Sequence, residues 1–164
     1  MSTYEIDFAQ QVPVIDSGIA SIKLGIFTKL SRSYRRTVGS EQAVPLAYRV
    51  VRGIFLDPIN QSTLEEFARC NTQLVESEIH KALADPELRE AISLVYAVRI
   101  IQLGWQTRNP FNDDANKLTE RATDNDMLIP DIVQMWGPDA IVNFFQYATD
   151  FTSRNLQAQP SDAD

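Results

Sequence analysis

The chain contains one histidine and one cysteine, side chains that often serve in nucleophilic catalysis or zinc binding. Cys70 and His80 lie ten residues apart in one predicted helix, so at about 3.6 residues per turn they point to different sides of it. The sequence also has no glycine-rich phosphate loop and no G-x-S-x-G or H-E-x-x-H motif. We therefore predict no catalytic residue, no metal ligand and no cofactor, and we favour a protein that is not an enzyme.

Two polar residues, Asn71 and Arg99, interrupt apolar helical faces in the middle of the chain. Each lies fourteen residues from Asp85, so the two would be level with each other if the chain folds back there. A buried arginine is costly unless it is paired, and we expect Arg99 to contact Asn71, Glu78 or an acid of another helix. The simpler interpretation is a structural pair that fixes how the helices align.

The alternative interpretation of Arg99 is a binding site. A mostly apolar pocket with one polar anchor is typical of small-ligand sites, and aromatic residues are frequent in the helices that follow Arg99. In this hypothesis four residues form the ligand or cofactor site: Arg99, Asn71, Trp105 and Trp136. Phe144, Phe145 and Tyr147 would line the same interior.

Oxygen-bearing side chains recur at helical spacing between Asn112 and Glu120, with Asp113 and Asn116 among them. This pattern resembles the motif with which terpene synthases bind magnesium diphosphate, where carboxylates one turn apart hold a hard cation. The second aspartate-rich cluster of that family is absent, and the chain is too short for its fold. We therefore interpret Asn112 and Asp113 as helix caps.

Charge is distributed unevenly along the sequence. The formal net charge is −7, but residues 1–60 hold seven Lys/Arg and five Asp/Glu, a balance of +2, while the rest hold eight and seventeen, a balance of −9. The basic residues gather in the second half of one predicted helix, and the interaction patch that we predict consists of Lys29, Arg32, Arg35 and Arg36. The simpler interpretation is a solvated helix face. The functional one is docking against an acidic surface of a partner or of a second copy.

Helical periodicity extends over most of the chain and predicts an all-α fold. Apolar residues recur every three or four positions from Leu64 to Ala82, and the segment from Leu88 to Leu103 is apolar on nearly all sides. We expect a single-domain bundle of five to seven helices, organised around a central antiparallel helical hairpin at 62–104. Asp85 would cap the second helix of this hairpin.

Further helices are expected on both sides of the hairpin. The first is expected to begin at Asp16 and end at Gly39, the second to begin near Pro45, and the last to carry a core stripe from Ile141 to Phe151. Residues 1–16 are expected to form an extended arm and residues 156–164 a disordered tail, with one helical domain over 1–155.

Length and composition favour a soluble, cytoplasmic protein. The 164 residues suffice for one core, and no apolar run reaches the length of a membrane span. Our leading hypothesis is a non-catalytic binding or assembly protein that acts through protein–protein contacts, with another protein or as a homo-oligomer. One alternative is a helical protein, which could be an enzyme, that binds a small apolar ligand or cofactor in a pocket near Arg99. The other is a helical coat or nucleic-acid packaging subunit, which the overall acidity makes less favoured.

Overall fold

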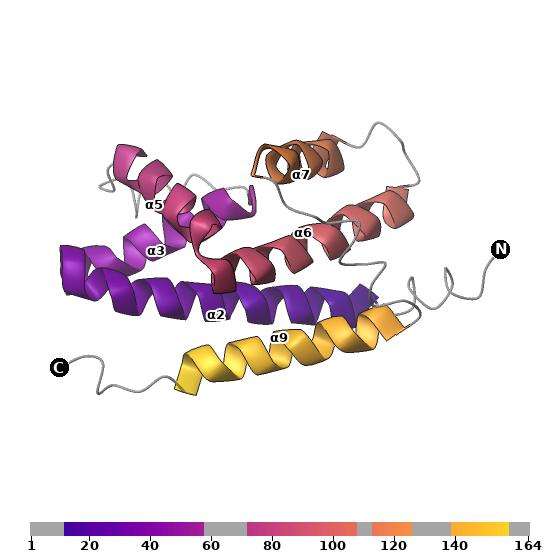
Figure 1. The fold of residues 1–164 in the computed structure, drawn as a ribbon, viewed down its shortest axis with the longest axis horizontal. Helices are drawn as coiled ribbons and strands as arrows, with labels where there is room; N and C mark the ends of the chain where they lie inside the picture. Colours follow the sequence, from indigo (N-terminus) through magenta and orange to yellow (C-terminus); the bar gives the residue numbers. More distant parts are fainter. Residues whose placement is uncertain (1–11, 58–71, 108–112, 126–138, 158–164) are drawn as a thin grey trace.

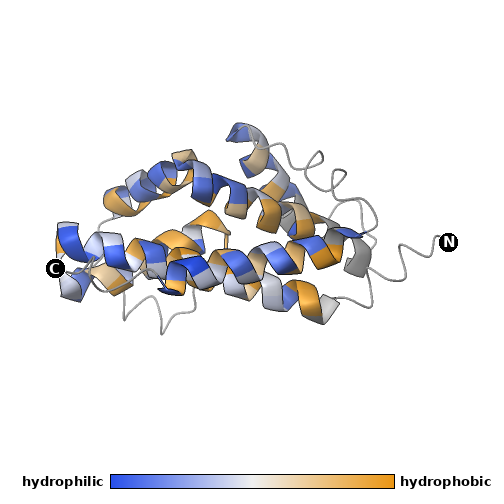
Figure 2. Cartoon of the chain, turned by 60° about the horizontal axis from the view of Figure 1, so that its bottom comes forward, coloured by the Kyte–Doolittle hydropathy of each residue, from blue (hydrophilic) through white to orange (hydrophobic). Residues whose placement is uncertain are grey.

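The computed structural model describes residues 12–57, 72–107, 113–125 and 139–157. In these ranges the chain is helical and without strands, as the sequence predicts, and six α-helices are present (Figure 1). Their bounds in chain order are α2 Val12–Val38, α3 Ser40–Ile54, α5 Thr72–Ala84, α6 Pro86–Thr107, α7 Asp113–Asp124 and α9 Ala140–Gln157. Hydrophobic and hydrophilic residues are mixed along each of them (Figure 2). None of these described helices is both long enough and apolar enough to cross a lipid bilayer.

Helix α2 is the element against which most of the bundle packs. Its buried side chains recur at spacings of three and four from Ile15 to Tyr34, and it packs against α3, α6 and α9. The central place predicted for the hairpin at 62–104 is therefore not confirmed. Helices α5 and α6 diverge from their junction (Figure 1), and residues 62–71 lie outside the described ranges.

Both predicted ends of the helical domain need correction. Residues 12–16 are not extended, because they form the beginning of α2. Pro13 is accommodated there because the first N–H groups of a helix have no partner within it. At the other end, Leu156 and Gln157 are the last residues of α9 and not part of a tail. Residues 1–11 and 158–164 lie outside the described ranges.

A single residue, Gly39, separates α2 from α3. Its φ of 88° lies in the left-handed region, which glycine adopts without a clash of its Cβ, and this confirms the predicted helix terminator. Helix α3 begins at Ser40 and not near Pro45, which lies inside it. The tight turn brings α3 back along α2, where the two helices bury a shared apolar seam.

Helices α2 and α9 lie side by side and run in the same direction (Figure 1). The ring of Phe144 lies over Gly18, and the ring of Phe151 lies over Gly25, seven residues further along each helix. Both rings are fully buried. A Cβ at Gly18 would lie only 2.6 Å from Phe144 Cε2, so the close approach of α9 depends on the absence of a side chain there.

Asp85 caps α6, as the sequence predicts. The backbone N–H groups of Glu87 and Leu88 donate to Asp85 Oδ1 over 3.0 and 3.1 Å. Every residue from Ala91 to Val98 is then buried, because α6 contacts α2, α5, α7 and α9. This burial agrees with the nearly continuous apolar sequence of the segment.

Helix α7 packs on α6 and fixes the end of α3. Arg121 donates to the backbone carbonyl of Gly53 and, over 3.4 Å, to that of Ile54. The Tyr96 hydroxyl of α6 donates to the same Ile54 carbonyl. Both carbonyls lie in the last turn of α3, where the Gly53 carbonyl also accepts from the Leu56 N–H over 3.4 Å, and the side chains from α6 and α7 add further donors to this helix end.

Candidate functional site

Three of the four residues of the predicted interaction patch line one groove. Lys29, Arg32 and Arg36 follow one another at spacings of three and four, so one face of α2 presents them together. Arg35 is exposed but does not line the groove, because its position is rotated by about 100° from that of Arg36. Three of the four residues of the predicted patch therefore share one surface, and Arg35 does not belong to it. That these residues contact a partner stays a prediction.

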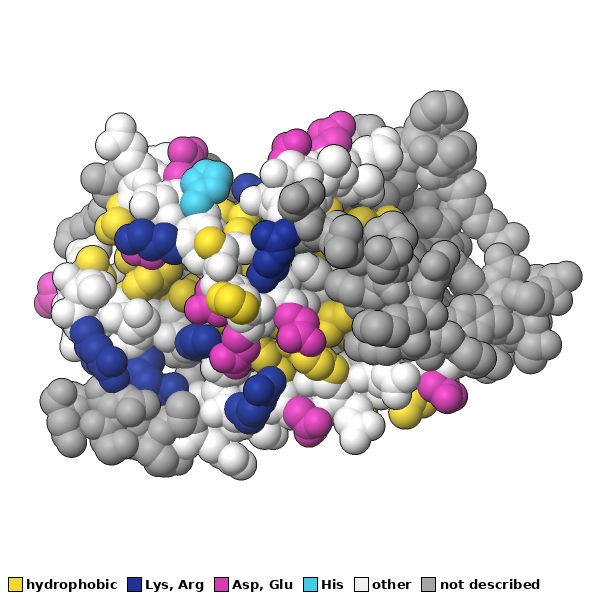
Figure 3. All heavy atoms as spheres, viewed as in Figure 1, with side chains coloured by type: hydrophobic (Ala, Val, Ile, Leu, Met, Phe, Trp, Pro, Cys, Tyr) yellow, Lys and Arg dark blue, Asp and Glu magenta, His cyan; other side chains and the backbone are white. Residues whose placement is uncertain are grey.

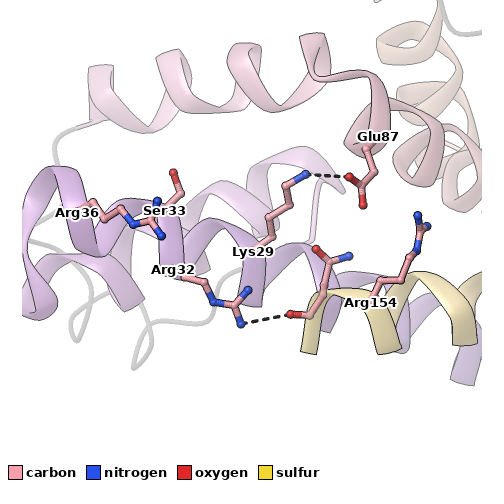
Figure 4. A pocket seen from close by; sticks show the side chains of 7 residues that line it. Lys29, Arg32, Ser33, Arg36, Glu87 and Arg154 are labelled. Atoms are coloured by element: carbon pink, nitrogen blue, oxygen red, sulfur yellow. Dashed lines mark hydrogen bonds and ion pairs between the residues drawn. The ribbon is translucent and has the colours of Figure 1, made fainter. Parts of the chain in front are cut away.

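The groove lies between the second half of α2, the first turn of α6 and the last turn of α9 (Figure 4). Its volume is about 540 Å³. Four further residues line it: Ser33, Glu87, Arg154 and Asn155. The site thus combines segments that are far apart in the chain, since Arg32 and Asn155 are separated by 123 positions.

Lys29 connects α2 to the N-terminal end of α6. Its Nζ lies 3.2 Å from Glu87 Oε2 and 4.0 Å from Asp85 Oδ2 (Figure 4). All three side chains are partly exposed, so each ion pair contributes at most about 1 kcal/mol and weakens with salt. An incoming anion can therefore compete with Glu87 for Lys29 at little cost.

Arg32 connects α2 to the C-terminal end of α9. Its Nη2 donates to the backbone carbonyl of Asn155 over 3.2 Å (Figure 4). The Asn155 amide in turn donates to the Phe151 carbonyl over 2.8 Å. A cation is favourable at this end of a helix, where the last carbonyls lack partners and carry partial negative charge.

Arg154 extends from α9 toward the end of α6 that carries Glu87 (Figure 4). It is exposed, and its charge acts on the neighbouring Tyr147. Burial raises the pKa of the Tyr147 hydroxyl above its usual range, and the negative charge of Glu90 adds to this effect, while Arg154 opposes it. Tyr147 therefore stays neutral at physiological pH and does not offset the positive charge of the groove.

The groove is a positive site on an acidic protein. Four of its side chains are cations and one, Glu87, is an anion, a local balance of +3 on a chain with a net charge of −7. Figure 3 shows Lys and Arg side chains, in dark blue, gathered near the left end of α2 in that view. Such a concentration of charge attracts anionic groups over a range of about 8 Å at physiological salt.

The predicted ligand site around Arg99 lies only partly within the described residues. Arg99 is half-buried, and its Nη1 donates to Gln102 Oε1 over 3.1 Å. The buried Gln102 donates to Asp16 Oδ1 of α2 over 2.7 Å, so Arg99 reaches an acid of another helix through Gln102. Within the described residues Arg99 donates to Gln102 and not to Glu78, which accepts from Lys81 over 3.4 Å.

The other residues of that predicted site are either exposed or lie outside the described ranges and side chains. Asn71 and Trp136 lie outside the described ranges, and the side chain of Trp105, in α6, is not among those described. Phe145, which was expected to line the interior, is 43% exposed. The expectation is wrong for Phe145 because α9 turns Phe144 inward and its neighbour outward.

The remaining chemical candidates of the sequence are dispersed. His80 is exposed on α5 and appears in cyan in Figure 3, and Cys70 lies outside the described ranges. Asn116 and Glu120 are exposed on α7. Within the described segments, no three Asp, Glu, His or Cys side chains converge into a group that could hold a metal ion.

Three residues of the groove carry no signal in the sequence that could have identified them: Glu87, Arg154 and Asn155. Each is an ordinary helix-end residue in its own segment, and only the packing of α9 and α6 against α2 brings it to Lys29 or Arg32.

Comparison of the chain with models of known protein families, with curated protein sequences and with solved structures finds no match.

Proposed function

We propose that the protein is a non-catalytic binding module that takes up an acidic segment of a partner protein in the groove between α2, α6 and α9. The observation that carries this proposal is the convergence of Arg154 with three cations of α2 in one groove, whose lining includes one carboxylate, that of Glu87, with Asp85 at its edge. Like charges that gather in one groove repel one another, and an anionic group that binds there reduces this repulsion. A helix face that serves only for solubility does not require cations from two distant helices to meet.

An acidic protein segment suits this groove better than a nucleic acid does. Binding of a long nucleic acid depends on many phosphate contacts along a sustained basic surface. Here four cations are confined to one groove, and the rest of the chain is acidic. A short run of Asp or Glu side chains needs only a few contacts and avoids the acidic remainder of the surface.

The existing contacts indicate how such a segment would bind. Lys29 would exchange Glu87 for a carboxylate of the partner, and Arg36 and Arg154 would add charge from both sides of the groove. Arg32 would stay bonded to the end of α9. Because these contacts are partly exposed, we expect binding that is modest in strength and sensitive to salt.

The proposal can be tested with a fluorescein-labelled oligoglutamate peptide as the probe and fluorescence anisotropy at low and physiological salt. Two unit charges about 6 Å apart in water interact by about 0.7 kcal/mol. Arg36→Glu or Arg154→Glu replaces an attraction by an equal repulsion, so the dissociation constant should rise about tenfold at low salt. Arg35→Glu is the matched control: it makes the same charge change on the same helix, outside the groove, and should have an effect of less than about twofold at physiological salt, where its charge is screened.

The Arg35→Glu control distinguishes peptide binding in the groove from general charge attraction. If Arg35→Glu weakens peptide binding as much as Arg36→Glu does, the proposal fails. Tighter binding of a single-stranded RNA oligomer than of the peptide, with the same loss in Arg154→Glu, would instead favour the nucleic-acid alternative. Circular dichroism of each variant verifies that the helices are retained.

A further inference from the structure

A second surface lies on the side of α9 opposite Arg154. Val142, Phe145, Thr149 and Leu156 recur at spacings of three, four and seven and share one outward face of the helix. Phe145 and Arg154 are nine positions apart, which is about two and a half turns. Val142 is 65% exposed, Phe145 43% and Leu156 48%, so this face forms an apolar ridge at the surface of the bundle.

The neighbouring face of α2 continues this surface without a charged residue. Ala20 and Leu24 are exposed, and Thr28 is half-buried one turn further along. Thr152 joins the two helices, because its hydroxyl donates to the Ser21 carbonyl over 2.7 Å. The ridge of α9 and this face of α2 together are uncharged, although 23% of the chain is charged.

The polar groups on this surface already have partners in the chain. The Thr28 hydroxyl donates to the Leu24 carbonyl over 2.8 Å, and the Thr149 hydroxyl donates to the Phe145 carbonyl over 3.0 Å. Burying a hydroxyl is costly chiefly when it loses its hydrogen bond. The surface can therefore lose its contact with water without leaving these hydroxyls unsatisfied.

An apolar groove lies beside Leu24, on the side of α2 that faces α3. Its volume is about 340 Å³, and its apolar lining consists of Leu24, Phe27, Tyr48 and Val51. The charged residues at its rim are engaged with neighbours: Lys23 lies 2.7 Å from Asp57, and Arg52 lies over the ring of Tyr48. The surface thus offers a ridge on α9 and a groove between α2 and α3, with Leu24 between them.

We infer that this surface binds a second copy of the chain. A two-fold axis passing close to Leu24 would bring the Phe145 ridge of each copy over the α2–α3 groove of the other, which makes the surface self-complementary. Charge restricts where such a dimer can form: two copies that each carry −7 repel one another, so they meet where no like charges are brought together, and this uncharged surface brings none together. The inference does not depend on the function proposed for the cationic groove.

The size of the surface predicts a concentration-dependent dimer. The ridge from Val142 to Leu156 is about 21 Å long at about 1.5 Å per residue, and packed helices lie about 8–10 Å apart. A face three helices wide is therefore roughly 20 Å square, or about 400 Å² per copy in projection, which is smaller than a standard specific interface and predicts weak association. Since added salt screens the repulsion between the two acidic copies, it should strengthen the dimer.

Sedimentation equilibrium of the full chain, at increasing concentration and at two salt concentrations, tests this inference. The average mass should rise with concentration from the 18.5 kDa of the monomer toward twice that value, and further at high salt. Phe145→Asp places a charge in the ridge at an exposed position and should weaken the dimer by about tenfold or more. Asn116→Asp, exposed on α7, adds the same charge elsewhere and should leave the dimer unchanged.

A cysteine cross-link provides a second, geometric test. In a chain with Cys70→Ser, the variant Leu24→Cys should oxidise to a disulfide-linked dimer, because residue 24 of each copy would lie beside the axis. His80→Cys, also at an exposed position, on α5, is the control and should form little cross-linked product under the same conditions.

Three outcomes would overturn the inference. The first is a wild-type chain that stays monomeric over the whole concentration range. The second is a dimer that Arg36→Glu dissociates and Phe145→Asp does not, which would move self-association to the cationic groove. The third is a Phe145→Asp variant with a lower melting temperature and an unchanged mass, which would show that another segment of the same chain covers the ridge. Loss of peptide binding in Arg154→Glu with the dimer intact leaves this inference standing.

Discussion

Replacing Gly25 by alanine tests how closely α9 packs on α2. The added Cβ would lie 2.8 Å from Phe151 Cε1, 3.0 Å from Cδ1 and 3.4 Å from the Thr152 Cα. Ordinary contacts between carbon atoms are about 3.5–4.0 Å long. The ring of Phe151 is fully buried, so it cannot move away without displacing its neighbours or α9 itself.

Two opposing effects determine the size of the change. Alanine in place of glycine inside a helix stabilises it by about 1 kcal/mol. Overfilling a packed core costs about 1–3 kcal/mol, and a displacement of roughly 0.7 Å points to the middle of that range, about 2 kcal/mol. The net result for Gly25→Ala should be a loss of about 1 kcal/mol in the free energy of unfolding, equivalent to a melting temperature lowered by about 2–4 °C.

Urea unfolding followed by circular dichroism measures this difference. Ala20→Gly, at an exposed position of the same helix, provides the matched control, because it reports the helix-propensity term alone, about 1 kcal/mol. Phe151→Leu leaves room for the methyl group that Gly25→Ala adds. The loss of unfolding free energy in the double variant should therefore be about 1 kcal/mol smaller than the sum of the losses in the two single variants.

The opposite sign would refute the packing argument. If Gly25→Ala stabilises the protein by the full 1 kcal/mol or so that an exposed helix gains, Phe151 does not lie against Gly25. The closer contact at Gly18, 2.6 Å from Phe144 Cε2, predicts that Gly18→Ala costs at least as much as Gly25→Ala.

Three further predictions concern the cap of α6 and the buried tyrosines. Asp85→Ala should lower the free energy of unfolding by about 1 kcal/mol in urea titrations, because it removes the acceptor of two backbone N–H groups; Asp85→Asn keeps an acceptor and should cost less than half as much. Tyr34→Phe should be neutral or stabilising by up to about 1 kcal/mol, because the buried Tyr34 hydroxyl has no hydrogen-bond partner in the described structure. Tyr96→Phe, in contrast, removes the hydrogen bond to the Ile54 carbonyl of α3 and should lower the free energy of unfolding by about 1 kcal/mol. Burial raises the pKa of Tyr96 to about 12, so the folded state keeps a proton that the unfolded chain releases near pH 10. The contribution of Tyr96 to stability is then fully present below about pH 10 and is lost as the pH rises toward 12, and Tyr96→Phe should reduce this loss in thermal melts.

Each of these predictions has an outcome that contradicts it. Equal losses in Asp85→Ala and Asp85→Asn would mean that the cap is not the source of the effect. A Tyr34→Phe variant less stable than the wild type would show that its hydroxyl does have a partner. An unchanged alkaline transition in Tyr96→Phe would assign that transition to other groups, of which Tyr34, with a pKa also raised by burial, is the first to test.

Features that depend on a few neighbouring residues could be predicted from the sequence. The helical class, the cap at Asp85 and the terminator at Gly39 follow from periodicity and from the backbone requirements of one turn. The central place in the bundle that was predicted for the hairpin at 62–104 could not be derived from such local features. The apolar surface of α6 indicates that it is buried on most sides, but it does not specify which helices cover it.

Only the part of the groove that lies on α2 could be predicted from the sequence. Lys29, Arg32 and Arg36 share a face of α2 by spacing alone, and the same spacing could have excluded Arg35. Arg154 depends on how α9 lies on α2, which is a property of long-range packing. Its local sequence gave no indication of that position.

The outward position of Phe145 did have a signal in the sequence. Phe144, Ala148 and Phe151 follow one another at spacings of four and three and are all buried, a pattern that leaves Phe145 off the core stripe. Adjacent positions of a helix are about 100° apart, so two neighbouring phenylalanines are both buried only where other elements cover the helix on several sides, as they cover α6. Treating the whole aromatic segment as interior overlooked this geometric limit.

The pairing of α2 with α9 joins the two ends of the described chain, and it imposes an order on folding. Thr152 bonds to the Ser21 carbonyl across 131 positions, and contacts of such long sequence separation are slow to form. While the chain is being synthesised, the face of α2 that carries Gly18 and Gly25 has no partner until α9 has emerged from the ribosome. The nascent protein therefore passes through an incomplete bundle whose apolar seam stays uncovered for most of synthesis, so the yield of folded protein should depend on how well chaperones protect that seam.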